Sequence, residues 1–185
     1  MAQFDNVFGE PTITPKGKLF FFDFDSPNTK EKHANNKFPS ERYDVTIGFT
    51  KDTDLSALKK ECDKVAKEAF KTTEGIEMPF NNGDEKNLDS MKGLIIIRAK
   101  SKKKPGCIDA DKARITEQDI IAGMWSRIQV TPMSYTSGKT KGVTLLLKNA
   151  QVFTAQEYDS LSGGQSAESA FDDDESNDSG LNDFN

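Results

Sequence analysis

The spacing of apolar residues changes from two to 3.6 residues along this sequence, and that change limits its fold most. Residues 42–50 alternate apolar and polar side chains, as a half-buried strand does. Between about 54 and 71, the apolar residues follow helical spacings of three and four, as on one face of a helix. They are Leu55, Leu58, Cys62, Val65 and Ala69. Strand-like segments also occur at 18–24, 93–100, 124–135 and 143–148. We therefore predict a mainly β (α+β) domain, a small closed barrel with one inserted amphipathic helix.

The first strand-like segment is unusually aromatic. It reads Lys-Leu-Phe-Phe-Phe-Asp-Phe from residue 18. By the alternation of side chains in a strand, Phe20, Phe22 and Phe24 should share one face. Leu19, Phe21 and Asp23 should share the other. At least one of these sets should be buried or serve as a platform for stacking.

Charge is distributed unevenly between the two ends of the chain. From Glu157 onward there are nine Asp and Glu residues and no Lys or Arg. Subtracting these nine from the 30 acids of the whole chain leaves 21 acids against 25 bases, a charge of +4. A basic body with an acidic tail indicates a nucleic-acid partner or a charged interaction tail, with a merely solubilising tail as the alternative. We predict a folded domain over 1–156 and a disordered tail over 157–185, because the tail has too little apolar surface to order.

Length and targeting features indicate one ordinary domain in the cytoplasm. No apolar run approaches the ~18 residues that a membrane span needs. The N-terminus has no signal-peptide pattern, and we expect no membrane association. Cys62 and Cys107 are too few for a disulfide framework and form no Cys-x-x-Cys metal clip.

The motifs that would indicate catalysis are incomplete. Gly138-Lys139-Thr140 ends like a phosphate-binding loop, but the leading glycine is missing and the segment joins two strands. The acids at 172–175 lack the pattern of a calcium loop. The only histidine, His33, lies in a polar loop and is expected at the surface. A nuclease-like carboxylate site could in principle use Asp23, Asp25 and Asp44, but nothing fixes their geometry. We expect no catalytic residues, no metal and no cofactor.

A binding surface is the better-supported interpretation. Trp125, Arg127 and Tyr135 share one face of a predicted strand, and lysine-rich turns lie nearby in the sequence. Single-stranded nucleic acid is held by such a mixture, because bases stack on rings while cations follow the phosphates. The alternative, with Trp125 in the core and the lysines as ordinary surface, stays open. The residues predicted to bind single-stranded DNA (ssDNA) are Trp125, Arg127, Tyr135, Lys139, Lys141, Arg98, Lys100, Lys102, Lys103 and Lys104.

Two segments resemble bacteriophage single-stranded DNA-binding proteins. They are Asp-Ile-Ile-Ala-Gly-Met-Trp at 119–125 and Gly-Val-Thr-Leu-Leu-Leu-Lys-Asn-Ala-Gln-Val at 142–152. The resemblance covers about 4–153 and is specific in 119–153. It implies an OB-fold, a five-stranded barrel with an added helix, that coats ssDNA without sequence preference in replication and recombination. By motif, only Trp125 and the 139–141 turn carry over as DNA-facing positions, and the other cations rest on charge.

The resemblance also implies a role for the tail. Such proteins use acidic tails to recruit polymerase, helicase or primase, and we expect this tail to compete with DNA for the groove as well. Its partner-binding residues are expected to be Phe171, Asp172, Asp173, Asp174, Glu175, Leu181, Asp183 and Phe184. Tails of that group commonly end in an aromatic residue, whereas Asn185 follows Phe184 here.

Partners and setting follow from the same resemblance. We expect ssDNA and replication proteins as partners in the bacterial host cytoplasm, with a homo-oligomer left open. The alternative class is an acidic-tailed protein-interaction module or a DNA mimic.

Overall fold

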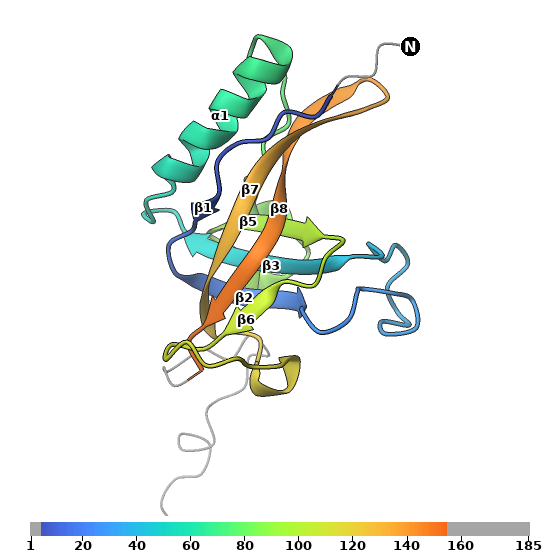
Figure 1. Cartoon of the computed structure of the whole chain (residues 1–185), viewed down its shortest axis with the longest axis vertical. Helices are drawn as coiled ribbons and strands as arrows, with labels where there is room; N and C mark the ends of the chain where they lie inside the picture. The colour runs from blue at the N-terminus through green and yellow to red at the C-terminus, as the bar shows by residue number, and fades with distance from the viewer. Residues whose placement is uncertain (1–4, 155–185) are drawn as a thin grey trace, which may run out of the picture.

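Five strands form a closed ring in the computed structural model, which describes residues 5–154 (Figure 1). They are β2 (Gly17–Asp23), β3 (Tyr43–Thr50), β5 (Leu94–Ser101), β7 (Trp125–Ser137) and β8 (Thr140–Val152). β2 pairs with β3, β3 with β5, β5 with β8, β8 with β7, and β7 with β2. Only the β5–β8 contact in this ring is parallel. The ring and the single inserted α-helix confirm the predicted mainly β, OB-like α+β fold.

Short elements extend the ring. β1 (Thr12–Ile13) pairs with β7, β6 (Gly106–Ile108) with β8, and β4 (Asn81–Asn82) with β5. Three single turns of 3-10 helix are η1 (Gly83–Glu85), η2 (Asp89–Met91) and η3 (Glu117–Asp119). η3 begins with a capping box at Thr116. No helix among residues 5–154 is long and apolar enough to cross a membrane.

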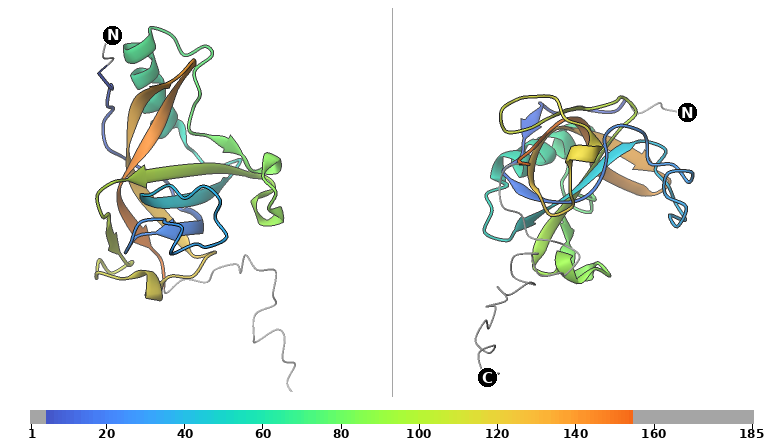
Figure 2. Two further views of the ribbon diagram at one scale, coloured as in Figure 1. Left: turned by 90° about the vertical axis from the view of Figure 1, so that its right-hand side faces the viewer. Right: turned by 90° about the horizontal axis from the view of Figure 1, so that it is seen from below.

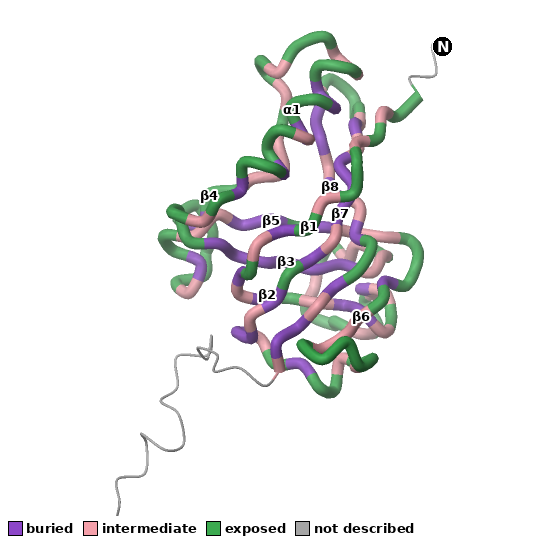
Figure 3. Tube along the Cα trace, turned by 60° about the vertical axis from the view of Figure 1, so that its left-hand side comes forward, coloured by how far each residue is buried: buried purple, intermediate pink, exposed green. Residues whose placement is uncertain are grey.

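The inserted helix, α1 (Ser56–Phe70), lies between β3 and β5 in sequence and packs against β7 and β8. Its buried side chains are Leu58, Cys62, Val65 and Ala66. This confirms the predicted apolar stripe and the placement of Cys62 in the core. The carboxylate of Asp54 accepts a hydrogen bond from the backbone N–H of Ser56 at 2.9 Å, just before the helix. In Figure 3 buried positions run along the strands of the ring, whereas buried and exposed positions alternate on α1.

The predicted division of the aromatic strand was wrong, because the register of β2 against β3 shifts between Leu19 and Phe21. Such a bulge breaks the alternation of faces. Phe20 therefore packs outside the ring against Met91 and Ile96. Phe22 and Phe24 lie on the inner side, with their rings stacked 5.7 Å apart.

The β7–β8 hairpin is longer than its periodicity indicated and extends beyond the ring alongside α1 (Figure 1). The backbone of Glu77 holds this extension in place, because its N–H donates to the Lys141 carbonyl and its carbonyl accepts from the N–H of Val143. The tail predicted over 157–185 lies outside the described residues.

Candidate nucleic-acid interface

The outer face of β2, β3 and β5 carries a hollow of about 880 Å³. Two segments supply its walls: the β2–β3 loop (residues 24–42) and the connection formed by residues 81–91. The left view of Figure 2 shows the β2–β3 loop in front of the strands and the connection protruding at one end of β5. In OB-folds, oligonucleotides bind the face of the second and third ring strands together with the loops that join strands one to two and four to five. The hollow occupies the position of the strand face and the first loop, and the turn of the β7–β8 hairpin corresponds to the second loop.

The floor of the hollow is aromatic and aliphatic. The Phe20 ring packs over Gly48, where an added Cβ would lie only 2.6 Å from it. A side chain at position 48 would therefore displace the floor. Phe21 lines the hollow and is 56% exposed, which is unusual for so large an apolar side chain. Phe38, on the β2–β3 loop, is 86% exposed.

Two buried carboxylates, Asp23 and Asp44, lie opposite each other on β2 and β3. Like charges in this position repel, and buried charges need partners. Arg98 donates to the Asp44 carboxylate at 2.7 Å, and this pair holds the guanidinium beside the hollow. Ser40 donates to the same Asp44 oxygen at 2.7 Å.

Asp23 is neutralised by the β2–β3 loop itself. Lys32 Nζ lies 2.8 Å and His33 Nε2 2.7 Å from the same Asp23 oxygen. Lys32 also lies 2.9 Å from Glu117. Partial burial opposes the charge of Lys32, but its hydrogen bonds to Asp23 and Glu117 outweigh that effect and raise the Lys32 pKa. The loop is thus held to the sheet by ion pairs, and His33 is a partly exposed wall residue.

A clamp between Asp25 and Glu117 closes the base of this loop. The Glu117 carboxylate accepts from the N–H groups of Phe24 and Asp25 at 2.6 and 2.7 Å. In return, the N–H of Glu117 donates to Asp25 at 2.8 Å, and this bond is the main reason that the Asp25 pKa is lowered. Lys104 lies 3.1 Å from the same carboxyl group. The β5–β6 turn is therefore tied to the β2–β3 loop.

Five of the eight cations predicted from sequence lie on β5 or in the turn that follows it, beside the hollow, and Arg98 lines the hollow itself. Arg98 and Lys100 are paired with Thr46 and Asp44 on β3, and Lys104 reaches Asp25. Lys102 and Lys103 are exposed in the same turn. Burial, and secondarily the neighbouring Arg98, lower the pKa of Lys100. An anion arriving here would relieve that repulsion.

Trp125 lies on the same outer surface, next to the hollow. It is half-buried at the start of β7 and paired with Lys18, which is itself paired with Gly48 under the Phe20 ring. Directly paired residues project from the same side of a sheet. The Lys18 ammonium lies 5.8 Å from the centroid of the Trp125 ring. Trp125 is therefore neither in the core nor fully exposed.

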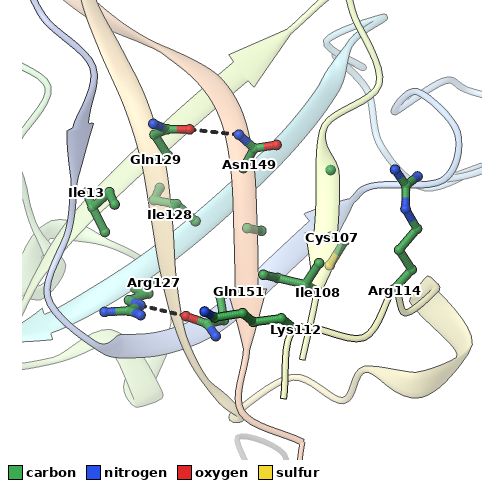
Figure 4. A pocket seen from close by; sticks show the side chains of 12 residues that line it. Ile13, Cys107, Ile108, Lys112, Arg114, Arg127, Ile128, Gln129, Asn149 and Gln151 are labelled. Atoms are coloured by element: carbon green, nitrogen blue, oxygen red, sulfur yellow. Dashed lines mark hydrogen bonds between the residues drawn. The ribbon is translucent and has the colours of Figure 1, made fainter. Parts of the chain in front are cut away.

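The structure does not bring the remaining predicted residues to the hollow. Tyr135, Lys139 and Lys141 lie at the far end of the hairpin, about 33 Å along β7 from Trp125 for ten residues at 3.3 Å each. The Tyr135 hydroxyl donates to Glu77 at 2.9 Å, and burial followed by this carboxylate raises the Tyr135 pKa. Arg127 faces a different pocket, where it donates to Gln151 at 2.7 Å (Figure 4).

Sequence reasoning missed three features of the hollow. The connection at 81–91 supplies a wall, and its turn-rich sequence did not indicate this. Phe21 was not separated from its neighbours, although a run of three phenylalanines indicated that some ring would face outward. Phe38 was also missed, although it lies in a lysine-rich loop.

Among residues 5–154, no group of three or more His, Cys, Asp or Glu side chains could hold a metal ion.

An OB-like ring with an aromatic, cation-edged hollow on this face is the architecture of a single-strand-binding protein. Residues 14–181 match the family model described as Enterobacter phage Enc34, ssDNA-binding protein. The chain belongs to this family of phage ssDNA-binding proteins. No curated protein matches the sequence.

Solved structures of phage proteins share the fold. The single-stranded DNA-binding protein from bacteriophage Enc34 has a TM-score of 0.62 at 16% identity, over 87% of this chain and 90% of that one. The same protein in complex with ssDNA gives 0.61 at 17% identity, over 80% and 88%. Gp2.5, a single-stranded DNA-binding protein encoded by bacteriophage T7, gives 0.57 at 15% identity, over 78% and 91%.

Proposed function

We propose that this protein binds single-stranded DNA across the hollow, without sequence preference and without catalysis, during phage replication and recombination. The observation that carries the proposal is the concave aromatic floor lined by Arg98, with Lys100 following on the same strand, β5, and the turn at 102–104 directly after it. We place this activity in the cytoplasm of the bacterial host. Family membership supports the ligand class, and the solved Enc34 complex with ssDNA supports it further.

In the proposed complex, bases lie against the rings while phosphates follow the cations. Phe21 and Phe38 are exposed enough to take a base each, and one base stacked on a ring is worth about 1–3 kcal/mol. Every base has a π-face, so this energy is largely independent of sequence. Paired bases inside a duplex are already stacked on each other, which disfavours double-stranded DNA.

The ion pairs around Asp23 and Asp44 prepare the hollow for this ligand. Arg98 and Lys32 are already held by carboxylates, so little side-chain freedom is lost when DNA arrives. Trp125 would extend the path by one strand beyond the hollow. Arg127 and the hairpin residues Tyr135, Lys139 and Lys141 stay predictions with no place on this path.

The acidic segment would act as a second ligand of the same surface. We propose that residues 157–185 form a tail separate from the domain at 1–156, and that its carboxylates compete with phosphates for the hollow. A tethered segment acts at a roughly millimolar effective concentration. When DNA displaces it, Phe171, Leu181 and Phe184 would become available to recruit polymerase, helicase or primase.

The test compares oligo-dT with duplex of equal length, for the full chain and for a chain ending at Gln156. We expect oligo-dT to bind more tightly, with an affinity that falls as salt rises, because phosphate contacts release counterions. Removing the tail should strengthen binding several-fold at low salt. Equal affinity for both ligands would contradict ssDNA binding, whereas unchanged affinity after truncation would contradict only the competition.

A further inference from the structure

A second pocket, of about 420 Å³, lies on the outer face of β1, β7, β8 and β6 (Figure 4). It shares no lining residue with the DNA hollow. Ile13 on β1 and Ile108 on β6 face it from opposite sides, and Ile13 is 59% exposed. Between them, Asn149 donates to Gln129 at 2.7 Å across the two long strands. The pocket thus combines aliphatic walls with an amide floor.

The charges that line this pocket are all positive. Lys112, Arg114 and Arg127 line it, and no carboxylate does. Asp109 and Asp111 belong to the same 109–114 loop but do not line the pocket. The Asp109 carboxylate accepts from the backbone N–H groups of Asp111 and Ala113, each at 2.9 Å. Burial, and secondarily Asp25 and Glu117, raise the pKa of the Cys107 thiol to about 12, so it lines the pocket as an apolar group.

Aliphatic walls and a cationic rim fit an acidic peptide better than a nucleic acid. Single strands are held by rings on which bases stack, and no aromatic residue lines this pocket. A peptide that carries an apolar side chain between carboxylates would fill the walls and pair with the rim.

The chain itself brings such a peptide to the site. Its described part ends at Thr154, three residues after Gln151, which lines the pocket. The Phe153 ring at this exit lies 3.9 Å from the Lys16 ammonium and 6.0 Å from the Arg127 guanidinium. The sequence continues as Glu157-Tyr158-Asp159-Ser160-Leu161. Tyr158 lies seven positions after Gln151, a reach of up to about 23 Å.

We infer that the segment Glu157–Leu161 docks in this pocket of its own chain. Tyr158 and Leu161 pack against Ile13 and Ile108, and the two carboxylates pair with the cationic rim. Docking of Glu157–Leu161 anchors the chain to the domain. The acids from Glu168 onward then extend from this anchored segment. This inference does not depend on DNA binding, and it concerns a different surface.

The test uses backbone amide NMR spectra of three chains: the full chain, one ending at Ser162 and one ending at Thr154. We expect the amides of Ile13, Ile108 and Gln151 to have the same shifts in the first two chains and different shifts in the third. Tyr158→Ala in the full chain should move these shifts at least halfway towards those of the shortest chain. The double variant Lys112→Glu/Arg114→Glu should remove at least half of the difference as well. Lys139→Glu, at the hairpin tip, is the matched control and should leave the difference intact.

Three results would overturn the inference. One is that all three chains have equal shifts at the pocket. Another is that the shifts that depend on Glu157–Leu161 appear at Phe21 and Arg98, which would place the segment in the DNA hollow. The third is a difference that disappears on dilution, which would show that a second copy supplies the segment.

Discussion

The hollow on β2, β3 and β5, where we propose that DNA binds, and the tip of the β7–β8 hairpin contain the same kinds of side chain but differ in how these are held. At the hollow, Arg98 and Lys32 are pinned by buried carboxylates next to a concave aromatic floor. At the tip, Lys139 is exposed and the Tyr135 hydroxyl is engaged by Glu77. Cations and rings are therefore not sufficient for a site. Concavity and prior anchoring separate the two regions, because both reduce the entropy lost on binding.

The largest expected effect comes from removing two exposed rings, Phe21 in the hollow and Phe38 on the loop that walls it. Phe21→Ala with Phe38→Ala should weaken oligo-dT binding by about 1–3 kcal/mol for each ring, because a base loses its stacking partner. Fluorescence anisotropy with labelled oligo-dT measures the change.

The matched control is Phe8→Ala. Phe8 is also exposed, but it lies on the N-terminal arm against Met133, outside the hollow. An equal loss in both variants would show that the hollow is not special.

The next effect should separate the two cationic regions. Replacing Lys102, Lys103 and Lys104 by Ala should reduce the salt dependence of ssDNA affinity by roughly 2 in the log–log slope, at about 0.7 for each lost phosphate contact. The double variant Lys139→Ala/Lys141→Ala should change the slope by less than about 0.7, the value for one phosphate contact. If the Lys139/Lys141 variant has the larger effect, DNA binds along the hairpin rather than across the hollow.

A smaller effect should appear at the margin of the hollow, at Trp125. Because Trp125 is the only tryptophan, its fluorescence reports this position alone. We expect oligo-dT to quench it, and Trp125→Ala to cost about 1 kcal/mol, the lower end of the range for a stacked base. Unchanged fluorescence at saturating DNA would confine the path to the three strands β2, β3 and β5.

The smallest effect concerns stability rather than binding. The pKa of Asp25 is lowered in the folded protein, mainly by the N–H of Glu117, so its charged form stabilises the fold. This stabilisation is complete above the unfolded pKa of about 3.9 and is lost as the pH falls through the folded value. Asp25→Asn should therefore lower Tm at pH 7 and flatten part of the decline below about pH 4.

Asp63→Asn, on the exposed side of α1, is the control for that measurement. A Tm profile for Asp25→Asn that matches the control would contradict the role of the clamp in holding the β2–β3 loop.

Strand positions followed closely from the sequence wherever one face is buried. Alternation over 42–50 predicted β3, found at Tyr43–Thr50, because each inward side chain must be apolar. The strand is not half-buried as predicted, since every residue from Asp44 to Phe49 is buried. The stripe that includes Leu58 and Val65 predicted α1 for the same reason. Periodicity did not reveal the bulge between Leu19 and Phe21, because both faces of that strand carry phenylalanine and neither register was excluded.

For the candidate site, the sequence supplied residue types but not their neighbours. The sequence singled out the cationic turn at 102–104, but its place beside the β2–β3 loop became visible only through the ion pair between Lys104 and Asp25. Tyr135 and Trp125 were grouped because they share a strand face, yet a strand of 13 residues separates them widely.

By itself, the sequence determined the alternation of strands and helix, the basic body with its acidic end, and the family resemblance. These are local or summed properties, which do not depend on contacts between residues far apart in the sequence. Tertiary structure alone decided which cations meet and which rings stay exposed. It also decided that two carboxylates, Asp23 and Asp44, face each other and draw in Lys32, His33 and Arg98. Those contacts join residues 9 to 54 positions apart, and the pairing of β2, β3 and β5 with the folding of the β2–β3 loop brings them together.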